Sequence, residues 1–149
     1  MKEEVILSIL PHKLREVFKR ENIDFQSIQE IRLRVGKPLI LLYKGSEVIP
    51  KVDGQIYHIT NEEIREMLDY ISGYSLYSYE REMSQGYITI EGGHRVGLSG
   101  QAIMENGKVK NLKYISSINV RMSHEILGCA DGLLPYITFH RRLYHTLLV

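Results

Sequence analysis

The first 22 residues carry apolar side chains at the three- and four-residue spacing of an α-helix. Two such stripes follow one another, and Pro11 lies between them. Proline sets φ to the value of a first helical turn and has no backbone N–H, so it favours the start of a new helix. We therefore predict two short helices within residues 1–22.

Between residues 29 and 35 the spacing changes to a strict alternation. Charged and apolar side chains follow each other in the order Glu30, Ile31, Arg32, Leu33, Arg34 and Val35. A period of two predicts a strand with one buried and one exposed face. Short apolar runs separated by glycine-containing turns predict further strands over residues 39–43, 47–50 and 55–59.

The clearest helix signal begins at Thr60. A threonine followed three residues later by a glutamate, here Glu63, is the capping-box pattern, and apolar residues follow at helical spacing. Gly73 favours a helix end because glycine readily adopts the left-handed conformation. We predict one helix between Thr60 and Gly73 and another over residues 75–84.

Strands dominate the next part of the chain, over residues 87–90, 95–103 and 115–122, and a helix is predicted over residues 130–140. This order of elements predicts an α+β fold with a mixed or mostly antiparallel sheet. The apolar ending Thr146–Val149 is interpreted as a strand that continues into a segment beyond this sequence. It would then form a disordered tail or self-associate through its edge. The alternative is an edge strand of the same sheet.

The composition fits one globular domain and narrows its chemistry. The chain has 149 residues, a net charge of +1 and no apolar run long enough to span a bilayer. A charge near zero gives no overall attraction to nucleic acid or anionic lipid. Cys129 is the only cysteine, which excludes an internal disulfide, and we interpret it as a small buried packing residue. The sequence contains no phosphate-binding loop, catalytic motif or metal-binding pair of histidines, so it offers no candidate catalytic or metal site.

Four arginines lie on predicted strands. Arg95 begins one strand, Arg121 lies inside another, and Arg32 and Arg34 share one strand face. An arginine on an otherwise apolar strand is costly unless it pairs with a carboxylate or a phosphate. Two interpretations stay open: a salt bridge or solvated sheet face, and a guanidinium held on a rigid strand to bind an anion.

Several blocks of the sequence, in the same order along the chain, resemble the stage III sporulation protein AA family. The blocks are residues 30–38 (EIRLRVGKP), 86–89 (GYIT), 92–100 (GGHRVGLSG), 117–121 (SINVR) and 128–130 (GCA). The likeness runs from the first predicted helix to the last residue. The family is in turn similar to the secretion and twitching-pilus retraction ATPases.

The resemblance implies three parts: N-terminal helices in residues 1–22, a PAS-like α/β domain in residues 23–127, and in residues 128–149 a linker helix with the first strand of a RecA-like ATPase domain. The full-length relative would be a hexameric ATPase that uses ATP and Mg²⁺ to drive a channel between mother cell and forespore. It would work in the mother-cell cytoplasm or at the membrane surface. This chain would be its regulatory and assembly domain. Because it stops before the phosphate-binding loop, we expect it not to be an enzyme by itself.

The resemblance also implies roles for the arginines. Arg95 and Arg121 match arginines that approach the nucleotide phosphates when the motor domain is present, and Arg32 and Arg34 would contact neighbouring subunits. The implied partners are the chain's own motor domain, further copies of the protein and membrane channel proteins of the stage III sporulation complex, with no nucleic acid.

Two other functions stay open. A small nucleic-acid-binding module would use Arg32, Arg34, Lys37 and the tyrosines, although the near-zero net charge argues against it. A stand-alone ligand-sensing domain would use a PAS-like pocket.

Overall fold

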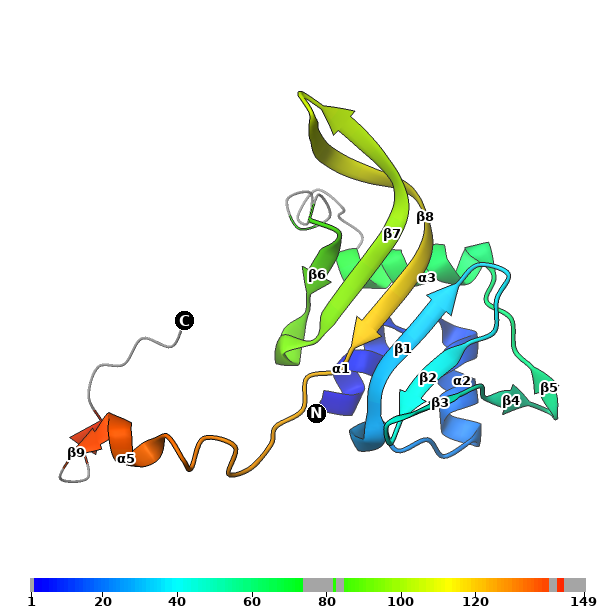
Figure 1. Cartoon of the computed structure of the whole chain (residues 1–149). Coiled ribbons are helices and arrows are strands. Elements are labelled where there is room, and N and C mark those ends of the chain that lie inside the picture. The colour runs from blue at the N-terminus through cyan, green and yellow to red at the C-terminus, as the bar shows by residue number, and fades with distance from the viewer. Residues whose placement is uncertain (1, 74–81, 83–84, 140–141, 144–149) are drawn as a thin grey trace.

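The computed structural model of the chain describes residues 2–73, 82, 85–139 and 142–143. Its body is a six-stranded sheet with helices on one face (Figure 1). The strand order is β3-β2-β1-β8-β7-β6, and all neighbouring strands are antiparallel. The strands are β1 (Ile28–Arg34), β2 (Ile40–Tyr43), β3 (Ser46–Val48), β6 (Tyr87–Thr89), β7 (Arg95–Glu105) and β8 (Lys108–Arg121). The helices are α1 (Lys2–Ile9), α2 (His12–Arg20) and α3 (Asn61–Ser72). The predicted α+β class with a mostly antiparallel sheet is confirmed.

Helices α1 and α2 confirm the two short helices predicted on either side of Pro11. Pro11 has a φ of −55° and stands immediately before α2. The two helices bury large apolar side chains in one cluster with the sheet, among them Ile6, Leu10, Leu14 and Phe18. Each such side chain stabilises the fold by about 1.5–3 kcal/mol relative to an exposed position. This packing makes one face of the sheet the core face.

Strand β1 lies in the middle of the sheet, between β2 and β8. Ile31 and Leu33 are fully buried, while Arg34 is exposed, so the predicted half-buried strand is confirmed. In Figure 1 the described helices of the body lie behind the sheet, and none of them covers the other face. Glu30 departs from the alternation, because it is only 8% exposed although it belongs to the open face.

Helix α3 begins and ends as predicted. The Thr60 hydroxyl accepts a hydrogen bond from the backbone N–H of Glu63, and the Glu63 carboxylate accepts one from the N–H of Thr60, so the capping box is complete. Gly73 ends the helix in the left-handed conformation with a φ of 53°. Tyr57 precedes the helix in a short segment after the hairpin of β4 (Lys51–Val52) and β5 (Gln55–Ile56), and its hydroxyl donates to the Glu63 carboxylate.

We expect the stability of the fold to fall at alkaline pH through Tyr57. Burial, followed by the hydrogen bond to Glu63, raises the pKa of Tyr57 above its ordinary value of about 10. The unfolded chain therefore releases this proton first, so the contribution is fully present below pH 10 and is lost as the pH rises toward the folded-state value. Urea unfolding at pH 8 and pH 11 should show a smaller pH-dependent loss for Tyr57→Phe than for the wild type. The control Tyr136→Phe, at a side chain that is 84% exposed, should keep the wild-type loss, and an equal slope in all three proteins would contradict the assignment.

Strands β7 and β8 form a hairpin longer than the predicted strands over 95–103 and 115–122, and it extends past α3 as an arm (Figure 1). The register shifts within it. Ser99 pairs with Ser117 and Gln101 with Lys113, so Gly100 alone stands opposite residues 114–116. Tyr114, in this bulge, has a positive φ of 49°, which is uncommon for a bulky residue. Beyond the bulge the strands run on to a turn at Asn106 and Gly107.

The helix predicted over residues 130–140 is wrong in extent. Of the residues in this range that the structure describes, only α5 (Leu134–Ile137) is α-helical, and the small strands β9 (Thr138–Phe139) and β10 (Arg142–Leu143) follow it. Proline within the first turn of α5 and glycine at 132 limit helix growth, and little of the body packs against this segment. Cys129, expected to be buried, is exposed. The predictions for residues 75–84 fall almost wholly, and those for Thr146–Val149 wholly, outside the described residues.

Candidate functional site

The open face of the sheet brings Arg95 and Arg121 together. Cross-strand pairing places Arg95 of β7 directly opposite Arg121 of β8, and Arg121 opposite Glu30 of β1 on its other side. Both arginines are exposed. Directly opposed residues in a sheet have Cβ atoms about 4.5–5.5 Å apart, and like charges there repel each other. An anion that binds between the two guanidinium groups would relieve this repulsion.

The two arginines are held differently. The guanidinium carbon of Arg95 lies 5.5 Å from the centre of the Tyr87 ring on β6, a cation–π contact. No carboxylate among the described residues forms an ion pair with Arg95 or with Arg121. Both therefore keep donors available for a ligand.

Glu30 and Arg32 form a separate network beside this pair. Arg32 donates to the carboxylates of Glu30 and Glu47, and the Asn119 amide donates to Glu30 at 3.2 Å. The hydrogen bond to Glu30, followed by the one to Glu47, raises the pKa of Arg32. Of the two interpretations open for the strand arginines, the salt bridge is therefore the one that applies to Arg32. Arg34 is exposed, lies opposite Ser117 and has no ion pair with any described residue.

His94 links the two arginine-bearing strands at the edge of this site. Its ring is 1% exposed, and Nδ1 accepts a hydrogen bond of 2.9 Å from the backbone N–H of Ser123. This contact joins the residue before Arg95 to the residue two positions after Arg121. Gly92 lies against the ring, since a Cβ at Gly92 would approach Nε2 to 2.9 Å.

Sequence reasoning did not single out Glu30, His94 or Asn119. Glu30 looked like any outward residue of an alternating strand, and Asn119 is a polar residue on the same face. Of these three residues, only His94 has a sequence context that could have indicated a structural role, because it lies between a glycine-containing turn and the arginine that begins a strand. The structure places Arg95 opposite Arg121 on an open face, and the predicted role of both residues in binding phosphate stays a prediction.

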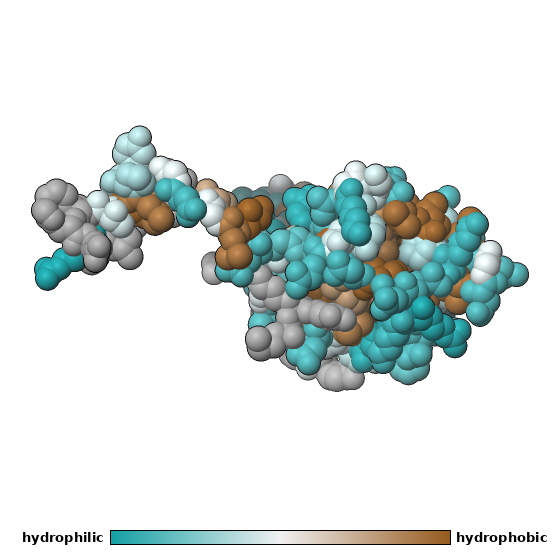
Figure 2. All heavy atoms as spheres, turned by 90° about the horizontal axis from the view of Figure 1, so that it is seen from below, coloured by the Kyte–Doolittle hydropathy of each residue, from teal (hydrophilic) through white to brown (hydrophobic). Residues whose placement is uncertain are grey.

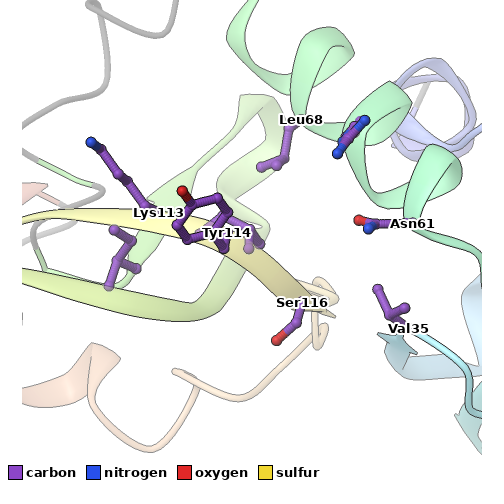
Figure 3. Close-up of a pocket in the computed structure, with 9 residues that line it drawn as sticks. Val35, Asn61, Leu68, Lys113, Tyr114 and Ser116 are labelled. Atoms are coloured by element: carbon purple, nitrogen blue, oxygen red, sulfur yellow. The ribbon is translucent and has the colours of Figure 1, made fainter.

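A cleft of about 540 Å³ lies away from the arginine pair, between α3 and β8 at the bulge (Figure 3). Figure 3 shows Asn61 and Leu68 on α3, Lys113, Tyr114 and Ser116 on β8, and Val35 just after β1. The lining is largely apolar, with two exposed cations, Arg65 and Lys113. Sequence reasoning did not predict this cleft, because it depends on the bulge opposite Gly100.

The described residues contain neither a group of three potential metal ligands nor a helix long and apolar enough to cross a membrane.

Comparison with known proteins gives one family match. The family described as "Sporulation stage III, protein AA" matches residues 1–149. Stage III sporulation protein AA of Bacillus subtilis (strain 168) is 37% identical over 146 residues, which is 98% of this chain and 45% of the relative. The chain thus spans less than half the length of that relative.

Two solved structures are also similar, at a low level. The Legionella pneumophila ATPase DotB matches with a TM-score of 0.41 and 13% identity, over 76% of this chain and 29% of that protein. The VirB11 ATPase of the Brucella suis type IV secretion system, in complex with sulphate, matches with a TM-score of 0.44 and 11% identity, over 89% and 36%.

Proposed function

This chain belongs to the Sporulation stage III, protein AA family, and from that premise we propose that it is the N-terminal regulatory and assembly domain of a secretion-type ATPase. In this proposal the open face of the sheet packs against a RecA-like motor domain. Arg95 and Arg121 then donate hydrogen bonds to the phosphates of a nucleotide bound by that motor.

The observation that carries the proposal is the direct opposition of Arg95 and Arg121 without a carboxylate partner among the described residues. A guanidinium group donates two parallel hydrogen bonds to phosphate oxygens and stays charged at every relevant pH. Two of them side by side on a rigid sheet suit a polyphosphate better than a single carboxylate. They fit the phosphates of ATP but cannot bind Mg²⁺, so the magnesium ligands would come from outside this site.

We expect Arg95→Ala and Arg121→Ala each to lower ATP turnover by about 100-fold, the usual order of effect when one donor to a developing negative charge is removed. The test protein is a chimera in which residues 1–149 replace the matching part of the B. subtilis relative. Steady-state ATP hydrolysis would be compared with that of the unmodified relative.

Arg20→Ala serves as the matched control. Arg20 lies on α2, on the helix side of the sheet, with an exposed side chain 3.7 Å from Asp53. Its loss should leave turnover unchanged. If ATP turnover were unchanged in both arginine variants, the assignment of Arg95 and Arg121 to the nucleotide site would be wrong. A chimera without turnover, beside an active B. subtilis protein, would contradict the proposed role of the domain.

The finer parts of the proposal follow from the family resemblance. They are a PAS-like description of the body, assembly into a hexamer with contacts from Arg34, and a channel partner at the membrane between mother cell and forespore. Arg32 is a weaker candidate for a subunit contact, because Glu30 and Glu47 already occupy its donors. The same two carboxylates also weaken the nucleic-acid alternative, because they neutralise Arg32, one of the three cations that such a binding site would use.

A further inference from the structure

The cleft between α3 and β8 has the chemistry of a site for an acidic, apolar protein segment. Its apolar lining comes from Val35, Leu68, Leu112 and Ile115. Arg65 and Lys113 are exposed beside this lining, and neither forms an ion pair with a described residue. The pairing of an apolar lining with two unpaired cations favours a ligand that carries both an apolar side chain and a carboxylate.

The arm of β7 and β8 extends this apolar surface away from the body. Ala102 and Met104 continue the row of β7 positions that faces the core, and they pair with Leu112 and Val109 on β8. Met104 is 58% exposed, so the described helices do not cover this row. The cleft therefore continues into an exposed apolar surface that runs along the arm of β7 and β8.

The chain itself carries a segment with the complementary composition. Residues 123–136 contain Glu125 and Asp131 and no lysine or arginine. The segment also exposes five large apolar side chains, which are Ile126, Leu127, Leu133, Leu134 and Tyr136. Figure 1 shows this segment running away from the body, and Figure 2 shows hydrophobic side chains at its surface. An apolar segment exposed to this degree marks an interaction site.

The start of the segment is tied down at the end of the sheet farthest from the cleft. The N–H of Met122 donates to the carbonyl of Gln29 at 2.9 Å, and the His124 ring contacts the carbonyl of Ile28, at the beginning of β1. The cleft lies beside Val35, just past the end of β1. Seven residues of strand separate the two places, which is about 23 Å. Leu127 is three residues beyond His124 and reaches at most about 11 Å from it.

We propose that Glu125, Ile126 and Leu127 of one copy occupy the cleft of a second copy of this chain. Ile126 and Leu127 contact the apolar lining, and Glu125 lies near Arg65 and Lys113. The occupant is a second copy because the segment cannot reach its own cleft while its anchor bonds hold. This contact does not depend on the nucleotide role proposed for Arg95 and Arg121.

Cys129 offers a direct test, because it is the only cysteine, is exposed and lies two residues after Leu127. A photoreactive benzophenone maleimide on Cys129 would be activated in an equal mixture of ¹⁵N-labelled and unlabelled chains. Mass spectrometry should find mixed-isotope cross-links from Cys129 to α3 or to residues 112–116. Cross-links within single chains only, or at other sites only, would overturn the proposal.

A charge exchange gives the second test, by sedimentation velocity of the 149-residue chain over a wide concentration range. Arg65→Glu with Lys113→Glu should weaken self-association at least tenfold, and adding Glu125→Lys should restore much of it. The control pair Lys44→Glu with Lys51→Glu changes the net charge equally at exposed positions outside the cleft and should have little effect. A monomeric wild type, an equal effect of the control pair, or no restoration would each overturn the proposal. Circular dichroism confirms that every variant is folded.

Discussion

Replacement of Gly100 by alanine is expected to destabilise the protein by about 2–3 kcal/mol, because β7 and β8 approach each other too closely at the bulge to admit a methyl group. A Cβ on Gly100 would lie 2.5 Å from the carbonyl oxygen of Lys113 and 3.0 Å from the Cα of Ile115. Both are backbone atoms, so no side-chain rotation relieves the contact. Urea unfolding followed by circular dichroism measures the change.

Gly132→Ala is the matched control for this prediction. Gly132 has an ordinary φ, and nothing lies within 4 Å of the position that its Cβ would take. Its substitution should change stability by less than about 0.5 kcal/mol. If Gly100→Ala were as mild as Gly132→Ala, the strands would be less tightly joined at the bulge than described.

The second large effect is expected at His94. His94→Leu fills a similar volume but removes the acceptor for the partly buried N–H of Ser123, and loss of such a hydrogen bond costs about 0.5–1.5 kcal/mol. Hydrogen exchange should accelerate at the Ser123 amide, and the free energy of unfolding should fall by that amount. His94→Asn supplies a side-chain oxygen near the position of Nδ1 and should recover part of both losses. Equal behaviour of the leucine and asparagine variants would show that the hydrogen bond contributes little.

His94 also connects stability with the proposed site. The hydrogen bond from Ser123 to His94 fixes the backbone just before Arg95 and just after Arg121. His94 is therefore a positioning residue for these two arginines. In the chimera with the B. subtilis relative, the asparagine variant should retain more ATP turnover than the leucine variant.

The features that could be predicted from the sequence are those that local chemistry decides. The capping box at Thr60 and Glu63 and the left-handed Gly73 depend on residues a few positions apart, and α3 begins and ends where they indicate. The alternation in residues 29–35 reflects burial of one strand face, and β1 follows it. These signals act within one element and need no knowledge of its neighbours.

Features that depend on pairing between distant segments were only partly predictable. Arg95 and Arg121 were selected through a family resemblance, but their direct opposition follows from the register of β7 on β8. The bulge opposite Gly100 and the cleft beside it arise from the same non-local register, and no local pattern marks them. The helix prediction for residues 130–140 was wrong because the local pattern was present but the non-local packing was not. Its apolar spacing suits a helix, but a short helix needs tertiary packing that this segment does not have in the described structure.

The second irregularity of the arm determines what its tip presents. If the pairing of Ala102 with Leu112 continued unchanged, Met104 would stand opposite Lys110. The single extra residue of β8 at this point reverses the parity of the strand, and Met104 pairs with Val109 instead. Lys110 then reaches Glu105 as an ion pair of 2.8 Å. The bulge at Lys110 thus decides whether the apolar row stops halfway along the arm or reaches its end. A slip of the two strands into the unbulged register would place this lysine in the row without any substitution.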